Sequence, residues 1–132
     1  MEKIVLDSYT WLAYLQNEAG ANKISGLLNE IFSGKKDAHM SAINYGEVLY
    51  MSRRKGGEEL FAKAENLLKH FPMTIEDATL DVCLAAAEWK AKISFSYANA
   101  FAASLTQRLN ATLVTGDPEF KPLKGKIKIE FI

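Results

Sequence analysis

Short apolar runs alternate along this chain with longer amphipathic stretches, and this alternation limits the folds that it can adopt. Each run has the length of a buried strand. The stretches between the runs carry apolar residues every three or four positions, which is the spacing of helices with one buried face. Strands separated by helices of this length favour an α/β fold with a parallel sheet covered on both faces. The predicted strands are Lys3 to Leu6, Ala38 to Ser41, Met73 to Ile75, Thr112 to Thr115 and Ile127 to Ile132.

Local signals predict where the helices begin and end. Asp7-Ser8 marks the start of the first helix, and Ser41 and Ser96 are predicted N-caps of two later ones. Gly34 is the predicted end of the second helix, and Gly56-Gly57 is expected to break a long helical region. The predicted helices follow Asp7-Ser8 to about residue 15 and then cover 24–32, 42–55, 60–71, 76–93 and 97–109.

Composition bounds the class of protein. With 132 residues, 48% of them hydrophobic, the chain is expected to form a single domain over 1–132 with a substantial core. Sixteen basic and sixteen acidic side chains give no net charge, which argues against coating nucleic acid by bulk charge. A lone cysteine, Cys83, and no Cys or His cluster favour a reducing cytoplasm. No run resembles a signal-peptide core or a membrane span.

Two acids follow predicted strands at the edge where parallel sheets bind their ligands. Asp7 comes directly after Ile4-Val5-Leu6, and Asp117 follows Thr115-Gly116. Each has an ordinary structural alternative. Asp7 can cap the next helix, and Asp117 can form a turn before Pro118.

Glu47 and Asn99 extend this set of polar residues. On a helical wheel Glu47 lies between Ile43 and Met51, so it is expected on an apolar sector where a charge needs a partner or a metal. The alternative is a helix rolled so that Glu47 is exposed. Asn99 stands three residues after Ser96, where it can serve the helix start or face an anionic ligand.

These residues lie in stretches that resemble the PIN domain family, and specifically its VapC-type toxins. The stretches are spread over nearly the whole chain, and the last is the most specific. The resemblance implies a three-layer α/β/α fold with a central, mostly parallel sheet. The matching stretches are Ile4-Val5-Leu6-Asp7-Ser8, Asn44-Tyr45-Gly46-Glu47-Val48, Ser96-Tyr97-Ala98-Asn99-Ala100-Phe101-Ala102-Ala103 and Ala111-Thr112-Leu113-Val114-Thr115-Gly116-Asp117-Pro118-Glu119-Phe120.

The resemblance also implies an endoribonuclease with an acidic pocket for Mg²⁺ or Mn²⁺, acting as the toxin of a toxin–antitoxin pair. Asp7, Glu47 and Asp117 match three acids of the family pocket, with Ser8 and Thr115 as supporting hydroxyl residues. The family usually has Asp where this chain has Asn99, and an amide lacks the charge that a hard dication prefers. Weakened catalysis is therefore expected, whether Asn99 is natural or introduced. The alternative is a silent PIN-like scaffold that binds RNA or a protein partner.

The remaining sequence features are less specific. The resemblance implies a homodimer and an antitoxin that binds between helices. Lysines at 121, 124, 126 and 128 could guide RNA or simply be solvated. His39 and His70 are expected at the surface or at a strand edge. A haloacid dehalogenase phosphatase is a poor fit because Tyr9 stands where a second Asp is needed, and the late strand lacks the lysine of a receiver domain.

Overall fold

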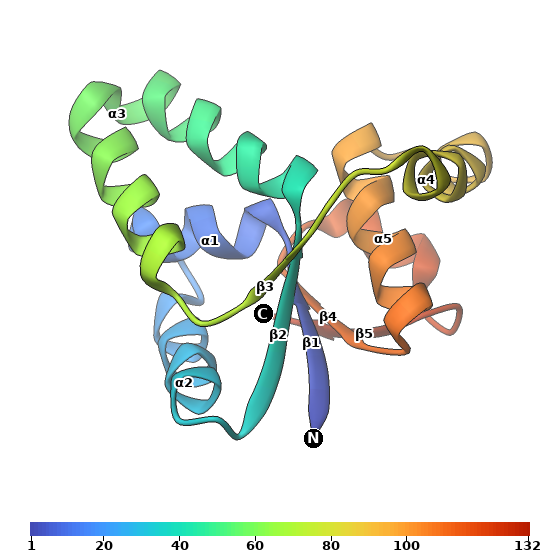
Figure 1. Ribbon diagram of the computed structural model, residues 1–132, viewed down its shortest axis with the longest axis horizontal. Coiled ribbons are helices and arrows are strands. Elements are labelled where there is room, and N and C mark those ends of the chain that lie inside the picture. The colour runs from blue at the N-terminus through green and yellow to red at the C-terminus, as the bar shows by residue number, and fades with distance from the viewer.

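A computed structural model describes all residues, 1–132, and shows a central five-stranded sheet with helices on both faces (Figure 1). Every strand pair is parallel, and the strand order is β3-β2-β1-β4-β5. This confirms the predicted α/β/α fold. The elements are β1 (Glu2–Leu6), α1 (Ser8–Leu15), α2 (Ala21–Phe32), β2 (Lys36–Ser41), α3 (Ala42–His70), β3 (Thr74–Glu76), α4 (Leu80–Lys92), α5 (Tyr97–Leu109), β4 (Thr112–Thr115), the 3₁₀ helix η1 (Pro118–Leu123) and β5 (Lys128–Phe131).

The two central strands are buried on both faces, so their alternate side chains belong to two separate cores. Ile4 and Leu6 of β1 face the core formed with α1, α2 and α3. Val5 faces the opposite core, formed mainly with α4, α5 and η1. Leu113 and Val114 of β4 divide in the same way. Continuous apolar runs are what strands covered on both sides require.

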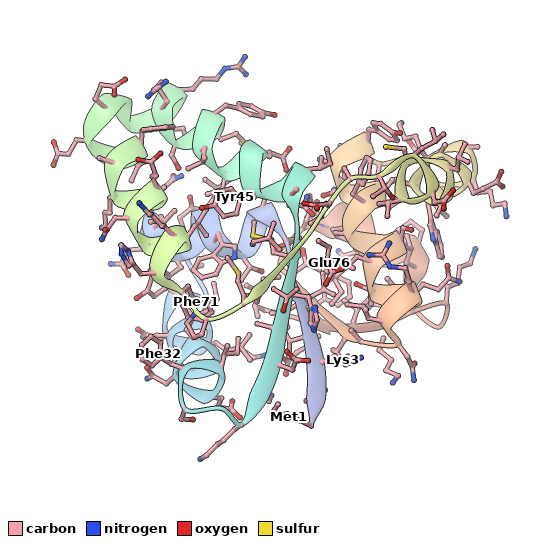
Figure 2. The ribbon with its side chains drawn as sticks, viewed as in Figure 1. Met1, Lys3, Phe32, Tyr45, Phe71 and Glu76 are labelled. Atoms are coloured by element: carbon pink, nitrogen blue, oxygen red, sulfur yellow. The ribbon has the colours of Figure 1, made fainter.

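Helices α1, α2 and α3 cover one face of the sheet and lie on the left in Figure 1. The apolar residues Ile24, Leu27, Leu28 and Ile31, which recur at helical spacing along α2, are buried, but Phe32 at its end is 70% exposed. Phe71, which follows α3, packs edge-on against Trp11. It also lies beside Phe32, as Figure 2 shows at the lower left. Gly57 takes a left-handed φ of 65° inside α3, so the predicted break is present as a kink within one long helix.

Helices α4 and α5 cover the other face. Ser96 caps α5 as predicted, since its Oγ accepts a hydrogen bond from the Asn99 N–H at 3.1 Å. Helix α4 begins later than predicted, at Leu80, because Thr79 is its N-cap and Glu76 belongs to β3. No helix is long and apolar enough to cross a membrane.

The prediction for His39 is wrong. Its side chain lies on β2, which is an inner strand, and the residue is only 8% exposed. Its Nδ1 lies 2.9 Å from an oxygen of Glu76 on β3, and its Nε2 lies 3.0 Å from an oxygen of Asp37. Arg108 of α5 reaches the other Glu76 oxygen at 3.5 Å. This polar network therefore holds the short edge strand that carries Glu76, labelled in Figure 2.

The strand order places the predicted acids beside each other in space. The chain winds outward from β1 in one direction through β2 and β3, and in the other through β4 and β5. In open parallel sheets the ligand crevice forms at this reversal, beyond the carboxyl ends of the two strands. Asp7 follows β1 and Asp117 follows β4, so both lie at the reversal.

Candidate active site

Asp7 is the buried anchor of the site. It is fully buried at the end of β1, and its Oδ1 accepts a hydrogen bond from the Thr10 N–H at 2.9 Å. Its Oδ2 accepts a hydrogen bond from the Thr115 hydroxyl at 2.5 Å. Asp7 is thus the N-cap of α1, which is the structural role that the sequence also allowed. The hydrogen bond from Thr115 in addition orients its carboxylate toward β4.

Thr115 connects the two strand-end acids. Its hydroxyl donates to Asp7 and accepts from the Asp117 N–H at 3.0 Å. Asp117 is half-buried, and its Oδ1 accepts from the Glu119 N–H at 2.9 Å, which caps η1. The structure therefore brings Asp7 and Asp117 together through one buried hydroxyl.

Burial raises the pKa of Asp7 to about 6 because the ionised form loses its hydration. The hydrogen bonds from Thr115 and Thr10 oppose this increase, and the nearby charge of Asp117 adds to it. No Lys, Arg or His forms an ion pair with either acid. The two acids repel each other across a site without a cationic side chain.

The amide nitrogen of Asn99 donates hydrogen bonds to two carboxylates of the pocket. Its Nδ2 donates to Asp117 Oδ2 at 3.0 Å and to Glu119 Oε1 at 2.8 Å. The same Glu119 oxygen accepts the Ser96 N–H at 3.2 Å. Asn99 is buried, so a neutral amide joins two carboxylates at the position where the resemblance implies another acid.

Glu119 is a residue of this site that the sequence reasoning missed. It stands in the matching stretch that begins at Ala111, but the sequence does not predict it as part of the pocket. The signal available was its position two residues after Asp117, which places it in the first turn of η1 beside the start of α5.

Glu47 is carried by α3, whereas the other three predicted site residues lie after β1, after β4 and at the start of α5. It lies on the second turn of α3, is half-buried and makes no hydrogen bond or ion pair. The apolar sector expected around it is divided, since Ile43 and Tyr50 are 37% and 50% exposed whereas Met51 packs against the core. The buried stripe of α3 instead runs through Asn44, Val48 and Ser52. Because Glu47 is half-buried, it lies at the border between the buried stripe and the exposed side of α3.

Asn44 ties the start of α3 to the rest of the site. Its Nδ2 donates to the Ala98 carbonyl at 3.1 Å, and its own carbonyl accepts the Ser8 hydroxyl at 3.2 Å. These contacts place the first turn of α3 next to the residues adjoining Asp7 and Asn99. Glu47 follows Asn44 by one helical turn, on the same side of the helix. Asn44 Oδ1 is buried without a hydrogen-bond partner.

The donor set suits a hard dication that keeps several waters. Carboxylate and amide oxygens are the ligands that Mg²⁺ and Mn²⁺ take in proteins, and Mg²⁺ commonly uses one or two carboxylates. Asp7 and Asp117 supply two, uncompensated by a basic side chain. No group of three or more His, Cys, Asp or Glu side chains lies close enough to hold an ion together. The four-residue ligand set of Asp7, Glu47, Asn99 and Asp117 therefore stays a prediction.

Comparison with known proteins identifies the family. The PIN domain family model matches residues 4–126, so the chain belongs to the PIN domain family. A search of curated proteins finds no match.

Solved structures share the fold over nearly the whole chain. The Mycobacterium tuberculosis toxin VapC20, described as cleaving the sarcin–ricin loop, has a TM-score of 0.76 at 18% identity, covering 90% of this chain and 93% of that chain. A chain of the DNA-bound VapBC complex from Salmonella typhimurium has a TM-score of 0.77 at 19% identity, covering 98% of each. VapBC2 from Rickettsia felis, bound to a promoter DNA fragment, has a TM-score of 0.75 at 16% identity, covering 97% of each. At these identities the likeness establishes the fold.

Proposed function

We propose that this protein is a metal-dependent endoribonuclease, the toxin of a type II toxin–antitoxin pair, with residues 1–132 forming one PIN domain. The site would comprise Asp7, Glu47, Asn99 and Asp117, with Ser8 and Thr115 in support. The observation that carries the proposal is the fully buried Asp7 beside Asp117 at the sheet reversal, with no basic side chain to compensate either. A buried carboxylate in this state is a common feature of functional sites.

The chain's own residues would fix the geometry of the reaction. Thr10 and Thr115 hold both oxygens of Asp7, so this carboxylate cannot rotate when substrate binds. The Glu119 N–H and the Asn99 amide hold Asp117 in the same manner. Preorganised ligands of this kind lower the cost of binding charged groups in the correct orientation. When bound, Mg²⁺ or Mn²⁺ would generate a nucleophilic water and stabilise the charge that develops on the RNA phosphate.

Asn99 supports the expectation of weakened activity. Its amide nitrogen, and not its oxygen, faces Asp117 and Glu119, so it supplies hydrogen bonds where a cation would need a negative charge. The same observation favours the alternative, a PIN-like scaffold that binds RNA or a protein partner without turnover.

Cleavage of RNA decides between the two. Purified protein, Asn99→Asp and Asp7→Asn are incubated with structured RNA in Mg²⁺ or Mn²⁺, and products are mapped by primer extension. We expect Asn99→Asp to cut at least about tenfold faster, the usual scale for disturbed metal sites, and Asp7→Asn to be inactive. Asn22→Asp makes the same chemical change at an exposed position on α2 and serves as the control. If neither the parent protein nor Asn99→Asp cleaves RNA with either metal, the ribonuclease proposal fails and the non-catalytic scaffold is the better explanation.

The proposal includes two protein partners in the cytoplasm. A homodimer is supported by the N-terminal part of α4, where Leu80 and Leu84 are 76% and 58% exposed one turn apart. An antitoxin is supported by the fold shared with chains of VapBC complexes. A basic antitoxin side chain at the Asp7–Asp117 pair would compete with metal. Light scattering and copurification with the product of the neighbouring gene test both partners.

A further inference from the structure

A groove lies along α4 and the C-terminal end of α5, away from the acidic pocket at the start of α5. Its first part has a volume of about 400 Å³ and is lined by Ala85, Glu88, Trp89, Lys92, Gln107 and Lys126. A second part of about 340 Å³ shares Gln107 and Lys126 and continues to Asn110 and Lys128. We call the whole feature the α4–α5 groove.

Trp89 forms a rigid aromatic wall of this groove. The residue is half-buried and packs against the core between the sheet and α5. Its indole Nε1–H donates to the Gln107 Oε1 at 3.2 Å. Because its one donor is used and one side is packed, the remaining ring surface presents a flat apolar face and no hydrogen-bonding group. Such a face suits stacking against another ring.

The α4–α5 groove is lined by more basic than acidic side chains. Lys92, Lys126 and Lys128 line the groove against one acid, Glu88, although the chain as a whole has no net charge. None of these four side chains belongs to an ion pair. Lys128 Nζ lies 3.5 Å from the Asn110 carbonyl, where it offsets the negative end of α5. The groove thus combines a stacking surface with uncompensated positive charge.

We propose that the α4–α5 groove binds a single-stranded segment of RNA, with one base stacked on Trp89 and the flanking phosphates on Lys92 and Lys126. Positively charged grooves with aromatic platforms are the usual means of binding single strands. The proposal rests on the proposed ribonuclease function for the identity of its ligand. Asn99 and Gln107 are eight residues apart on α5, which is about 12 Å along the helix axis. That distance corresponds to about four stacked nucleotides of one strand.

The site is tested by binding without turnover. Oligoadenylate RNA of about ten nucleotides, within the usual site size of a single-strand groove, is titrated in EDTA while tryptophan fluorescence is recorded. The other tryptophan, Trp11, is fully buried, so quenching by stacked bases reports on Trp89. A labelled copy of the RNA gives the affinity by fluorescence anisotropy.

Variants separate stacking from charge and from folding. Trp89→Ala should weaken binding roughly tenfold, the scale of one lost base–aromatic stack, whereas Trp89→Phe should retain most of the affinity. Lys126→Ala should lower the slope of log K against log salt by about 0.7. Lys63→Ala, at an exposed position of α3, is the matched control and should leave the slope unchanged.

Three results would overturn the proposal. The first is RNA binding that is unaffected by Trp89→Ala and Lys126→Ala. The second is RNA binding without quenching of Trp89. The third is quenching by polyglutamate but not by RNA, which would assign the groove to an acidic peptide. A protein that binds RNA through Trp89 yet never cleaves it contradicts the proposed activity and leaves this site standing.

Discussion

The Asn99→Asp substitution tests how the acidic pocket is held together. In the structure the Asn99 amide donates to Asp117 at 3.0 Å and to Glu119 at 2.8 Å. An aspartate cannot donate either hydrogen bond, and it adds a third carboxylate to the pair. Hydrogen bonds to charged groups contribute about 1.5 kcal/mol each at the lower end of their range, which fits this partly exposed site. Repulsion among carboxylates in a solvated setting adds about 1 kcal/mol.

We therefore expect Asn99→Asp to unfold about 4 kcal/mol more easily than the parent protein in EDTA. For a chain of this size that corresponds to a melting temperature lower by roughly 15 °C. Mn²⁺ should recover part of the loss, because three carboxylates bind a dication better than two carboxylates and an amide. An affinity gain of about 10- to 100-fold makes the metal-dependent increase in stability larger than the parent's by about 1.4–2.7 kcal/mol at saturating metal.

Differential scanning fluorimetry with EDTA and with a Mn²⁺ titration measures both effects. Asn99→Ala is the matched control, since it removes the two hydrogen bonds without adding charge. It should be destabilised in EDTA and gain little from Mn²⁺. Equal melting temperatures for the parent and Asn99→Asp in EDTA, with equal gains from Mn²⁺, would refute the role assigned to the amide.

Three further predictions concern single positions. Because folding raises the pKa of Asp7 from 3.8 to about 6, the folded state binds this proton more tightly than the unfolded state does. The free energy of unfolding should therefore fall by about 3 kcal/mol as the pH rises from below 4 through 6. Urea titrations should show this pH dependence for the parent and not for Asp7→Asn, which should be the more stable protein at pH 7.5. His39→Ala removes one of the two partners of Glu76 and should cost about 2 kcal/mol, with faster hydrogen exchange confined to β3 and its neighbour. Uniformly faster exchange over the whole chain would contradict this. Gly116→Ala drives a Cβ into the Tyr9 ring and should cost about 1–3 kcal/mol; Tyr9→Ala should relieve that loss in a double-mutant cycle, and strict additivity would argue against the clash.

The architecture was predictable because each element carries its own signal. The stripe from Ile24 to Ile31 is buried as its spacing indicates, and Gly57 interrupts α3 where a glycine pair predicts a break. Strand ends followed by acids located the sheet edge that carries the site. These are local properties of the chain, and the parallel topology then fixes which ends meet.

The contacts that define the pocket were not predictable, because they join segments far apart in sequence. A helical wheel cannot tell which side of α3 meets the sheet, so it could not show that the buried stripe runs through Asn44, Val48 and Ser52. The network of His39 with Glu76 depends on the β2–β3 pairing, which no local pattern of the chain reports. The contact of Asn99 with Glu119 likewise requires η1 to turn back toward α5.

The surroundings of Asp7 and of Asp117 differ in how far they offset the negative charge, and this difference affects where a cation would bind. Around Asp7 the fold supplies hydrogen bonds from Thr10 and Thr115 but leaves the charge itself uncompensated, so the site carries a stability cost that a bound cation would relieve. Around Asp117 the Asn99 amide already provides two of the contacts that a cation would provide. Occupancy of this pocket should therefore depend mainly on the Asp7 side. A basic side chain from a partner that approaches the Asp7–Asp117 pair would offset this charge and block metal at the same time.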